Sequence, residues 1–369
     1  MNLLLKLKIK KNKNMKLNLL LILLFPLFIH AQNDTLVEEE IDFSQYENAT
    51  PASNSKKYCT SKVLGISPNK LISIGYDFQG SHEIENHDEL NTIVNHGVAK
   101  INNASGLRLA ANFPVISTTK WLVNLGVNYN QTNYAVDTKS PNNYFINNLT
   151  NNGLSTTGIS ATIFKPIDEK HFLLFSGSAD ANGNYNFGSS NLSDQLFKPK
   201  ISAALLYGIK RNDRSMIAFG FARTYRPGGL GYIPLVLFNH TFQNRKWGIE
   251  ALFPARLAVR RTFNARNLLL AGYELEGNSY SILNNNGPTQ SPYNDLELRR
   301  SEIRARVSFE KLITGFVWFT AQVGYRINYN FNIDKGDNIR LIGSKDAYYM
   351  ENHLTNPLYF NIGIHLVSP

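Results

Sequence analysis

The feature that most constrains this chain is a strict two-residue alternation of apolar and polar side chains. In the stretch FTAQVGYRINYNFNI (319–333), every odd-numbered position is apolar or amphipathic and every even-numbered position is Thr, Gln, Gly, Arg or Asn. The pattern starts at Leu71 and returns in WLVNLGVNYN (121–130), EIRARVSFE (302–310) and LYFNIGIHLV (358–367). Such alternation predicts strands with one apolar and one polar face. We therefore predict an all-β fold, and the question is what covers the apolar faces.

The N-terminus has the pattern of an export signal. A basic start precedes an apolar run from Leu19 to Ile29, and a cleavage site follows Ala31. This run is too short for a spanning helix, and no later run approaches the roughly 20 apolar residues that one needs. We predict a signal peptide over residues 1–31, a polar periplasmic lead-in over 32–69 with one short strand near Val63, and a barrel domain over 70–369.

Charge and cysteine content exclude several classes of protein. Six Lys and no acidic residue lie in residues 1–31, so the formal net charge of +10 falls by six to +4 after cleavage. An exported chain with so small a charge is not expected to bind nucleic acid. The single Cys59 excludes a disulfide-stapled module. We expect no cofactor and no metal; His82, His87 and His96 in the first long loop are better explained as solvated side chains.

The connections between strands fall into two classes. Short turns are expected at 114–119, 165–170, 210–215, 242–246 and 311–315. Long, Asn-rich loops are expected near 80–97, 135–153, 182–197, 281–297 and 334–355. Outer-membrane barrels combine short periplasmic turns with long outer loops in this way.

A membrane barrel explains the apolar faces better than a secreted β-sandwich does. Several strands exceed the usual 5–6 residues, and their polar faces suit a wet lumen. Aromatic residues gather toward strand ends, as in interfacial girdles: Trp121, Tyr129, Trp318, Tyr329 and Phe331. A sheet in hydrocarbon must also close, because unpaired backbone groups there cost several kcal/mol each. We predict a transmembrane antiparallel up-and-down β-barrel of about 12–14 strands, monomeric, in the outer membrane of a Gram-negative bacterium.

The strand number depends on Pro254. Thirteen long segments are visible, whereas single-chain bacterial barrels have an even number of strands. The alternation of short and long connections breaks between 246 and 281, where Pro254 interrupts EALFPARLAVRR (250–261). A turn at Pro254 gives fourteen strands, and one non-spanning segment gives twelve. The stretch GLGYIPLVLFNHTFQNRKWGIEALFPARLAVRR (229–261) resembles the central hairpin of an uncharacterised family of Gram-negative outer-membrane β-barrel proteins. That resemblance implies the fold and the location, and no activity.

Charged side chains on the polar faces of four successive strands are the strongest candidates for function. Alternation places the following residues on one stretch of wall facing the lumen: Arg256, Arg260, Glu274, Glu276, Arg300, Glu302, Arg304, Arg306, Glu310 and Arg326. They form either an ion-pair network that fills the lumen or a basic strip that selects anionic solutes. Arg261 falls on the lipid side, so we expect it near a strand end.

These observations favour a barrel without enzymatic activity. No GxSxG or HExxH motif is present. We predict a pore or binding protein for small hydrophilic solutes, including anionic ones, with outer-membrane lipid as its surroundings. The alternative is a structural or surface-interaction barrel with a plugged lumen; a barrel hydrolase or a secreted β-sandwich is less favoured.

Overall fold

The computed structural model describes residues 57–87, 97–139, 144–185, 199–282, 296–335 and 348–367. The chain divides into residues 1–55 and 56–369, and all described residues belong to the second unit. The predicted signal peptide, the first part of the predicted lead-in (32–56) and His96 lie outside the described residues.

The described residues form strands along almost their whole length. The strands are β1 (Lys70–Gln79), β2 (His82–His87), β3 (Gly97–Ser117), β4 (Leu122–Val136), β5 (Leu154–Pro166), β6 (His171–Gly183), β7 (Lys200–Asn212), β8 (Ser215–Thr224), β9 (Gly231–Thr241), β10 (Trp247–Phe253), β11 (Arg256–Asn264), β12 (Asn267–Ser281), β13 (Leu296–Thr314), β14 (Val317–Lys335), β15 (Glu351–Leu354) and β16 (Leu358–Val367). The all-β prediction is confirmed.

Fourteen of these strands close into an antiparallel barrel. Each strand pairs with its neighbours along the chain, and β1 closes the ring by pairing with both β16 and β3. The two short strands, β2 and β15, pair with each other and extend one end of the wall. Pro254 lies in the turn between β10 and β11, where the Phe253–Pro254 peptide is cis. The prediction of 12–14 strands is therefore confirmed at fourteen, and the turn at Pro254 supplies the strand that the sequence segments left uncounted.

The outer surface of the barrel is an apolar belt. Its large side chains are strongly exposed, among them Ile74 (56%), Ile159 (63%) and Phe221 (73%). Soluble monomers rarely expose contiguous apolar patches of more than a few hundred Å². A closed barrel with this belt is a transmembrane barrel. No helix in the part of the chain that the structure describes has the length and apolar character of a membrane span.

One β-bulge reverses the faces of β14 and corrects the aromatic prediction. The register between β13 and β14 shifts where Ser301 pairs with Asn330 and Glu302 with Asn328, which leaves Tyr329 as the extra residue. Odd-numbered side chains face outward up to Ile327, but beyond the bulge Phe331 is only 1% exposed. Phe331 therefore packs inside the barrel.

Two more of the predicted girdle residues are buried. Trp318 is 8% exposed and packs inside against Leu268 and Val367, because its position shares the inner face of β14 with the polar residues. Tyr129 is 6% exposed, whereas Trp121 (42%) and Tyr329 (50%) are exposed. Arg261, as predicted, lies three residues before the end of β11, with its guanidinium over the Trp247 ring (4.8 Å).

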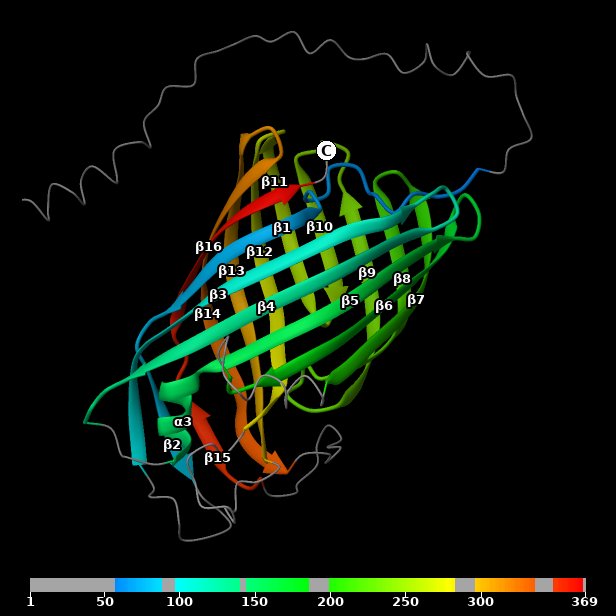
Figure 1. Ribbon diagram of the computed structural model, residues 1–369. Helices are drawn as coiled ribbons and strands as arrows, with labels where there is room; N and C mark the ends of the chain where they lie inside the picture. The colour runs from blue at the N-terminus through cyan, green and yellow to red at the C-terminus, as the bar shows by residue number, and fades with distance from the viewer. Residues whose placement is uncertain are drawn as a thin grey trace, which may run out of the picture. The chain divides into compact units, whose positions relative to one another are not determined.

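The end of the barrel that carries the long connections is filled by an apolar core. A helix that the sequence did not predict, α3 (Tyr144–Asn152), contributes Phe145, Ile146 and Leu149 to this core. Phe145 packs against Phe331 with ring centroids 6.2 Å apart. Figure 1 shows α3, β2 and β15 together at this end, and the C-terminus at the opposite end. The lumen is thus obstructed on the long-loop side.

At the short-turn end, residues 57–69 (the lead-in segment) run along the ends of several strands without forming a strand of their own, so the strand expected near Val63 is not found. The backbone N–H of Cys59 donates to the carbonyl of Asp168 (2.9 Å), and that of Leu64 donates to Asp213 (2.8 Å). Val63 is 3% exposed and joins an apolar cluster on the inner faces of β5–β9. The lead-in segment therefore obstructs the second end.

Candidate functional site

Between these two ends lies a compact group of charged side chains, called here the central cluster, in which five of the seven are buried and Arg108 and Glu276 are partly exposed (29% and 33%). It consists of Asp77 on β1, Arg108 on β3, Glu276 on β12, Arg300, Glu302 and Arg304 on β13, and Arg326 on β14. The two-residue period places alternate side chains of each strand on the same face. Ring closure then brings β1 and β3 beside β13 and β14, through β16.

Glu302 is the acceptor at the centre of this cluster. Its carboxylate is 1% exposed and accepts from Arg304 Nε (2.6 Å), Arg300 Nη2 (3.0 Å) and Arg326 Nη1 (3.4 Å). Charge-assisted bonds of this kind are about twice as strong as neutral ones. One carboxylate thus joins three guanidiniums from two adjacent strands.

Asp77 and Glu276 connect the same arginines to Arg108 on β3, across the closure between β1 and β16. Asp77 accepts from Arg108, and it lies 3.4 Å from Arg326 Nη2 and 3.7 Å from Arg304 Nη1. Glu276 accepts from Arg108 Nη2 (2.8 Å) and forms an ion pair with Arg304. The central cluster therefore ties together five strands, from β1 and β3 to β12–β14.

The remaining predicted residues lie in three separate places. Glu274 pairs with Arg306 at 2.6 Å, on β12 and β13. Glu310 pairs with Lys70 at 2.7 Å, at the start of β1. Arg260 is 1% exposed and pairs with Glu250 on β10 at 2.9 Å. Arg256 lies opposite Glu274 in register, but Glu274 is held by Arg306, and Arg256 is exposed.

Sequence reasoning missed the partners Lys70, Asp77, Arg108 and Glu250. Asp77 stands in LISIGYDFQ (71–79) on the polar face, and Arg108 alternates with Leu107 and Leu109, so both carried the same signal as the predicted residues. The sequence did not show that these side chains lie close together, since β1 and β13 are more than 200 residues apart in the chain. The closure of the ring supplies it.

The ion pairs among the predicted Arg and Glu residues determine how much free charge this wall presents to the lumen. Each predicted Glu forms an ion pair with at least one basic side chain, so most of the arginines are neutralised where they stand. Buried charges are tolerated only when paired in this way. The group acts as a cross-link through the middle of the barrel, and Arg256 is the exposed guanidinium among the predicted residues.

Two cavities adjoin this obstructed lumen. A polar cavity of about 330 Å³ lies between the lead-in segment and the strands β10–β14, and its lining includes Lys70, Glu250, Arg256, Arg306 and Glu310. A cavity of this size has room for several water molecules.

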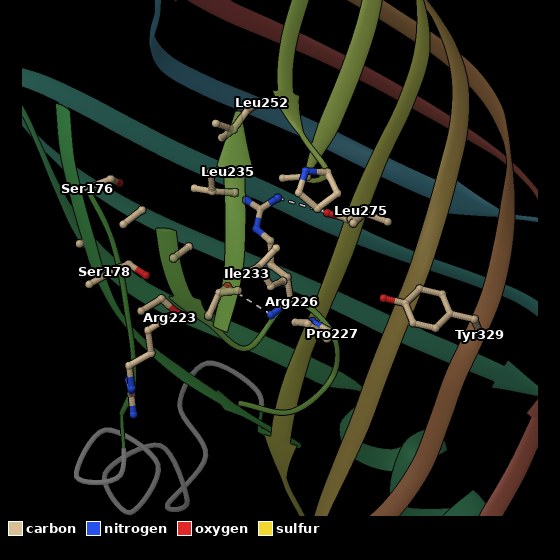
Figure 2. A pocket seen from close by; sticks show the side chains of 18 residues that line it. Ser176, Ser178, Arg223, Arg226, Pro227, Ile233, Leu235, Leu252, Leu275 and Tyr329 are labelled. Atoms are coloured by element: carbon tan, nitrogen blue, oxygen red, sulfur yellow. Dashed lines mark hydrogen bonds between the residues drawn. The ribbon is translucent and has the colours of Figure 1, made fainter. Parts of the chain in front are cut away.

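A second cavity, of about 200 Å³, has a mostly apolar lining. Figure 2 shows Leu235 and Leu252 on one side and Tyr329 on the other, with Arg226 between them donating to the carbonyl of Leu275 (3.2 Å). The tip of the short β10–β11 hairpin, with Pro254, also contributes.

The described side chains include one Ser–His pair, since His365 Nδ1 lies 2.8 Å from Ser73 Oγ, and one Asp–His pair, since His171 Nδ1 lies 2.8 Å from Asp168 Oδ2. Burial raises the pKa of the Cys59 thiol, although Lys210 acts in the opposite direction, so the thiol is a poor nucleophile. Among the described residues, no group of three or more His, Cys, Asp or Glu side chains is placed to hold a metal ion.

Comparisons with known proteins extend only to solved structures. The Pseudomonas putida toluene transporter TodX has 10% identity and a TM-score of 0.32, over 84% of this chain and 94% of its own. An outer-membrane channel from Pseudomonas putida F1 has 12% identity and a TM-score of 0.33, over 82% and 97%. The outer membrane protease OmpT from Escherichia coli has 8% identity and a TM-score of 0.29, over 83% and 100%.

No protein-family model and no curated protein matches the chain. The resemblance drawn from residues 229–261 therefore stays a prediction. At such low TM-scores the structural likenesses give no information on ligands, and the barrel rests on its own strand pairing.

Proposed function

We propose that this protein is an outer-membrane β-barrel that admits small hydrophilic solutes to its lumen, as a pore or as a binding protein. The observation that carries this proposal is the polar cavity of about 330 Å³ inside a closed transmembrane barrel. Its charged lining includes Lys70, Arg256 and Arg306 together with Glu250 and Glu310, and charged side chains that line a pore select solutes in channels.

The proposal places the signal peptide at 1–31, the periplasm at the short-turn end and a single barrel in outer-membrane lipid. The apolar belt supports the lipid surroundings, and the contrast between short turns and long loops supports this orientation. Solved outer-membrane channels, among them the toluene transporter TodX, have the barrel architecture in common with this chain.

Anionic solutes are the finer part of the proposal. Among the lining residues, Lys70 is neutralised by Glu310 and Arg306 by Glu274. Arg256 is exposed, and its register partner Glu274 is occupied. One positive charge in a narrow cavity raises the local concentration of anions.

Conductance in planar bilayers tests both parts. A KCl gradient across purified protein is expected to give a reversal potential of anion-selective sign, which Arg256→Ala shifts toward neutrality. Arg261→Ala is the matched control, because Arg261 lies on the same strand with its side chain on the outer face. Equal reversal potentials in the two variants would refute the anion selectivity.

The lead-in segment offers a second measurement. Deletion of residues 57–66 removes the groups that contact Asp168 and Asp213 and is expected to raise the conductance. If neither the whole chain nor this deletion conducts, and neither binds small solutes, the pore and binding proposals are both refuted.

A structural or surface-interaction barrel is the second candidate. The apolar core around α3 and the lead-in segment, which obstruct opposite ends, favour it. Shortening the loop at 135–153 or at 334–355 is then expected to abolish the cellular phenotype while a folded, heat-modifiable barrel persists. Retention of the phenotype in both variants would contradict this candidate.

A further inference from the structure

Four buried hydrogen-bond donors at the central cluster are left without partners. They are Arg304 Nη2, Arg326 Nε, Gln79 Nε2 and the hydroxyl of Tyr359, and among the described residues none of these atoms has a hydrogen bond. All four side chains are at least 96% buried. Since an unpartnered buried donor costs about 1–3 kcal/mol, native structures leave few of them, and several together require a cause.

The four donors belong to neighbouring positions on one patch of wall. Gln79 lies directly opposite Tyr359 across β1 and β16, and Arg304 lies opposite Arg326 across β13 and β14. Tyr359 lies opposite Gly324, two residues before Arg326 on the same face.

The ring of Tyr359 brings the two pairs together. It leans over Gly324, where an added Cβ would meet Tyr359 Cε1 at 2.7 Å. The guanidinium carbons lie 5.1 Å (Arg326) and 5.7 Å (Arg304) from the ring centroid. The small residue at 324 thus lets the tyrosine reach the two arginines.

The charges of the central cluster do not balance. Four guanidiniums, from Arg108, Arg300, Arg304 and Arg326, face three carboxylates, from Asp77, Glu276 and Glu302. The neighbouring carboxylates are occupied, since Glu274 holds Arg306 and Glu310 holds Lys70. One positive charge therefore remains uncompensated among the described residues. Arg300, Arg304 and Arg326 are buried and Arg108 is 29% exposed, so three of the four guanidiniums stand where an unpaired charge is strongly unfavourable.

We propose that the central cluster binds one small monovalent anion, such as chloride, through the free N–H groups of Arg304, Arg326 and Gln79 and the hydroxyl of Tyr359. An anion accepts from all four donors and supplies the missing negative charge. A water molecule accepts from only about two donors at once and leaves the charge uncompensated. The bound anion would hold the arginines of the central cluster together. Its binding does not require that solutes pass through the barrel.

Bromide, an anomalous scatterer, tests the site directly. Crystals of the full-length mature barrel grown in bromide are expected to show an anomalous peak in contact with Arg304, Arg326 and Tyr359. In detergent, the apparent Tm is expected to rise saturably when chloride replaces gluconate at constant ionic strength, since a ligand that binds only the folded state stabilises it.

A pair of tyrosine variants separates the site from general salt effects. Tyr359→Phe removes one donor and keeps the ring, so the chloride concentration at half-saturation is expected to rise about tenfold. Tyr185→Phe is the control, because Tyr185 is equally buried but its hydroxyl has two hydrogen-bond partners, the carbonyl of Ala181 (2.9 Å) and the hydroxyl of Thr157 (2.8 Å). It is expected to leave the half-saturation unchanged.

Absence of the bromide peak together with a Tm independent of chloride would overturn the proposal. Equal chloride responses in the two tyrosine variants would also overturn it, because the effect would then arise elsewhere. The bromide experiment uses the unmodified protein and therefore stands even where Tyr359→Phe does not fold. No outcome depends on conductance, so this proposal and the pore proposal fail independently.

Discussion

We expect Glu302 to be the position where the central cluster is most sensitive to substitution, because it contacts three arginines. The change Glu302→Gln keeps the size of the side chain and removes one negative charge that three guanidiniums share. Two carboxylates then face four arginines, and the new amide N–H₂ adds donors where acceptors are needed. Removal of one partner of a buried ion pair costs about 3–5 kcal/mol. We expect a loss of this size in the free energy of unfolding.

The assay is urea unfolding of the barrel in detergent or lipid, followed by the heat-modifiable band on SDS gels. With a urea dependence of about 1–3 kcal/mol per molar, the midpoint is expected to fall by at least about 1 M. Glu274→Gln is the matched control, since Glu274 pairs with Arg306 on the adjacent strand with 24% and 27% of the two side chains exposed. Such a pair contributes about 1 kcal/mol or less.

The double variant Glu302→Gln with Arg300→Gln gives a further check. It restores the charge difference of the original cluster and is expected to recover part of the lost stability, as coupled neighbours do. If Glu302→Gln and Glu274→Gln have the same midpoint, burial does not control the value of these ion pairs, and the reasoning is refuted.

Two further predictions concern the belt and the lead-in segment. Ile159 is 63% exposed in the middle of β5, so Ile159→Lys is expected to cost about 2–4 kcal/mol in lipid and to lower the yield of folded barrel in membranes; an unchanged yield would contradict a lipid-facing belt. Cys59 is 7% exposed and its pKa is raised by burial, so its alkylation is expected to be at least about tenfold slower in the folded barrel than in urea; equal rates would show that the lead-in segment is not packed as described.

The strands were predictable because alternation is a local property. The short turn expected at 165–170 and the long loops expected near 135–153 and 182–197 leave two segments, 153–165 and 170–182, which correspond to β5 and β6 within one residue at each end. Pro254 marked the break between β10 and β11, because proline interrupts the pairing of a strand. The helix α3 was not predictable in the same way, since its sequence YFINNLTNN carries no acidic residue in the first turn and no basic residue in the last. Packing of Phe145 and Leu149 into the interior core holds it.

The bulge at Tyr329 shows where alternation gives the wrong face. In FTAQVGYRINYNFNI the apolar residues keep their odd numbers to the end, so the sequence alone places Phe331 and Ile333 with Tyr325 and Ile327 in lipid. One extra residue in the pairing reverses the face, because the side-chain period is two. Both outcomes bury an apolar side chain, in lipid or in the interior core, and hydrophobicity does not distinguish them. Only the register across β13 does.

The charged residues show the same limit of sequence reasoning, because the sequence predicts their number and their face but not their partners. The sequence predicts six arginines and four glutamates on the wall, which is an excess of two positive charges. It does not predict which residues carry that excess. The partners that sequence missed, Lys70 and Arg108 on one side and Asp77 and Glu250 on the other, leave that excess unchanged but distribute it. Arg260, Arg306 and Lys70 are each neutralised by one glutamate. One excess charge is then Arg256, exposed beside the polar cavity, and the other belongs to the central cluster. The first is the charge that the proposed pore would present to a solute in the polar cavity, whereas the second is the charge for which we propose a bound anion.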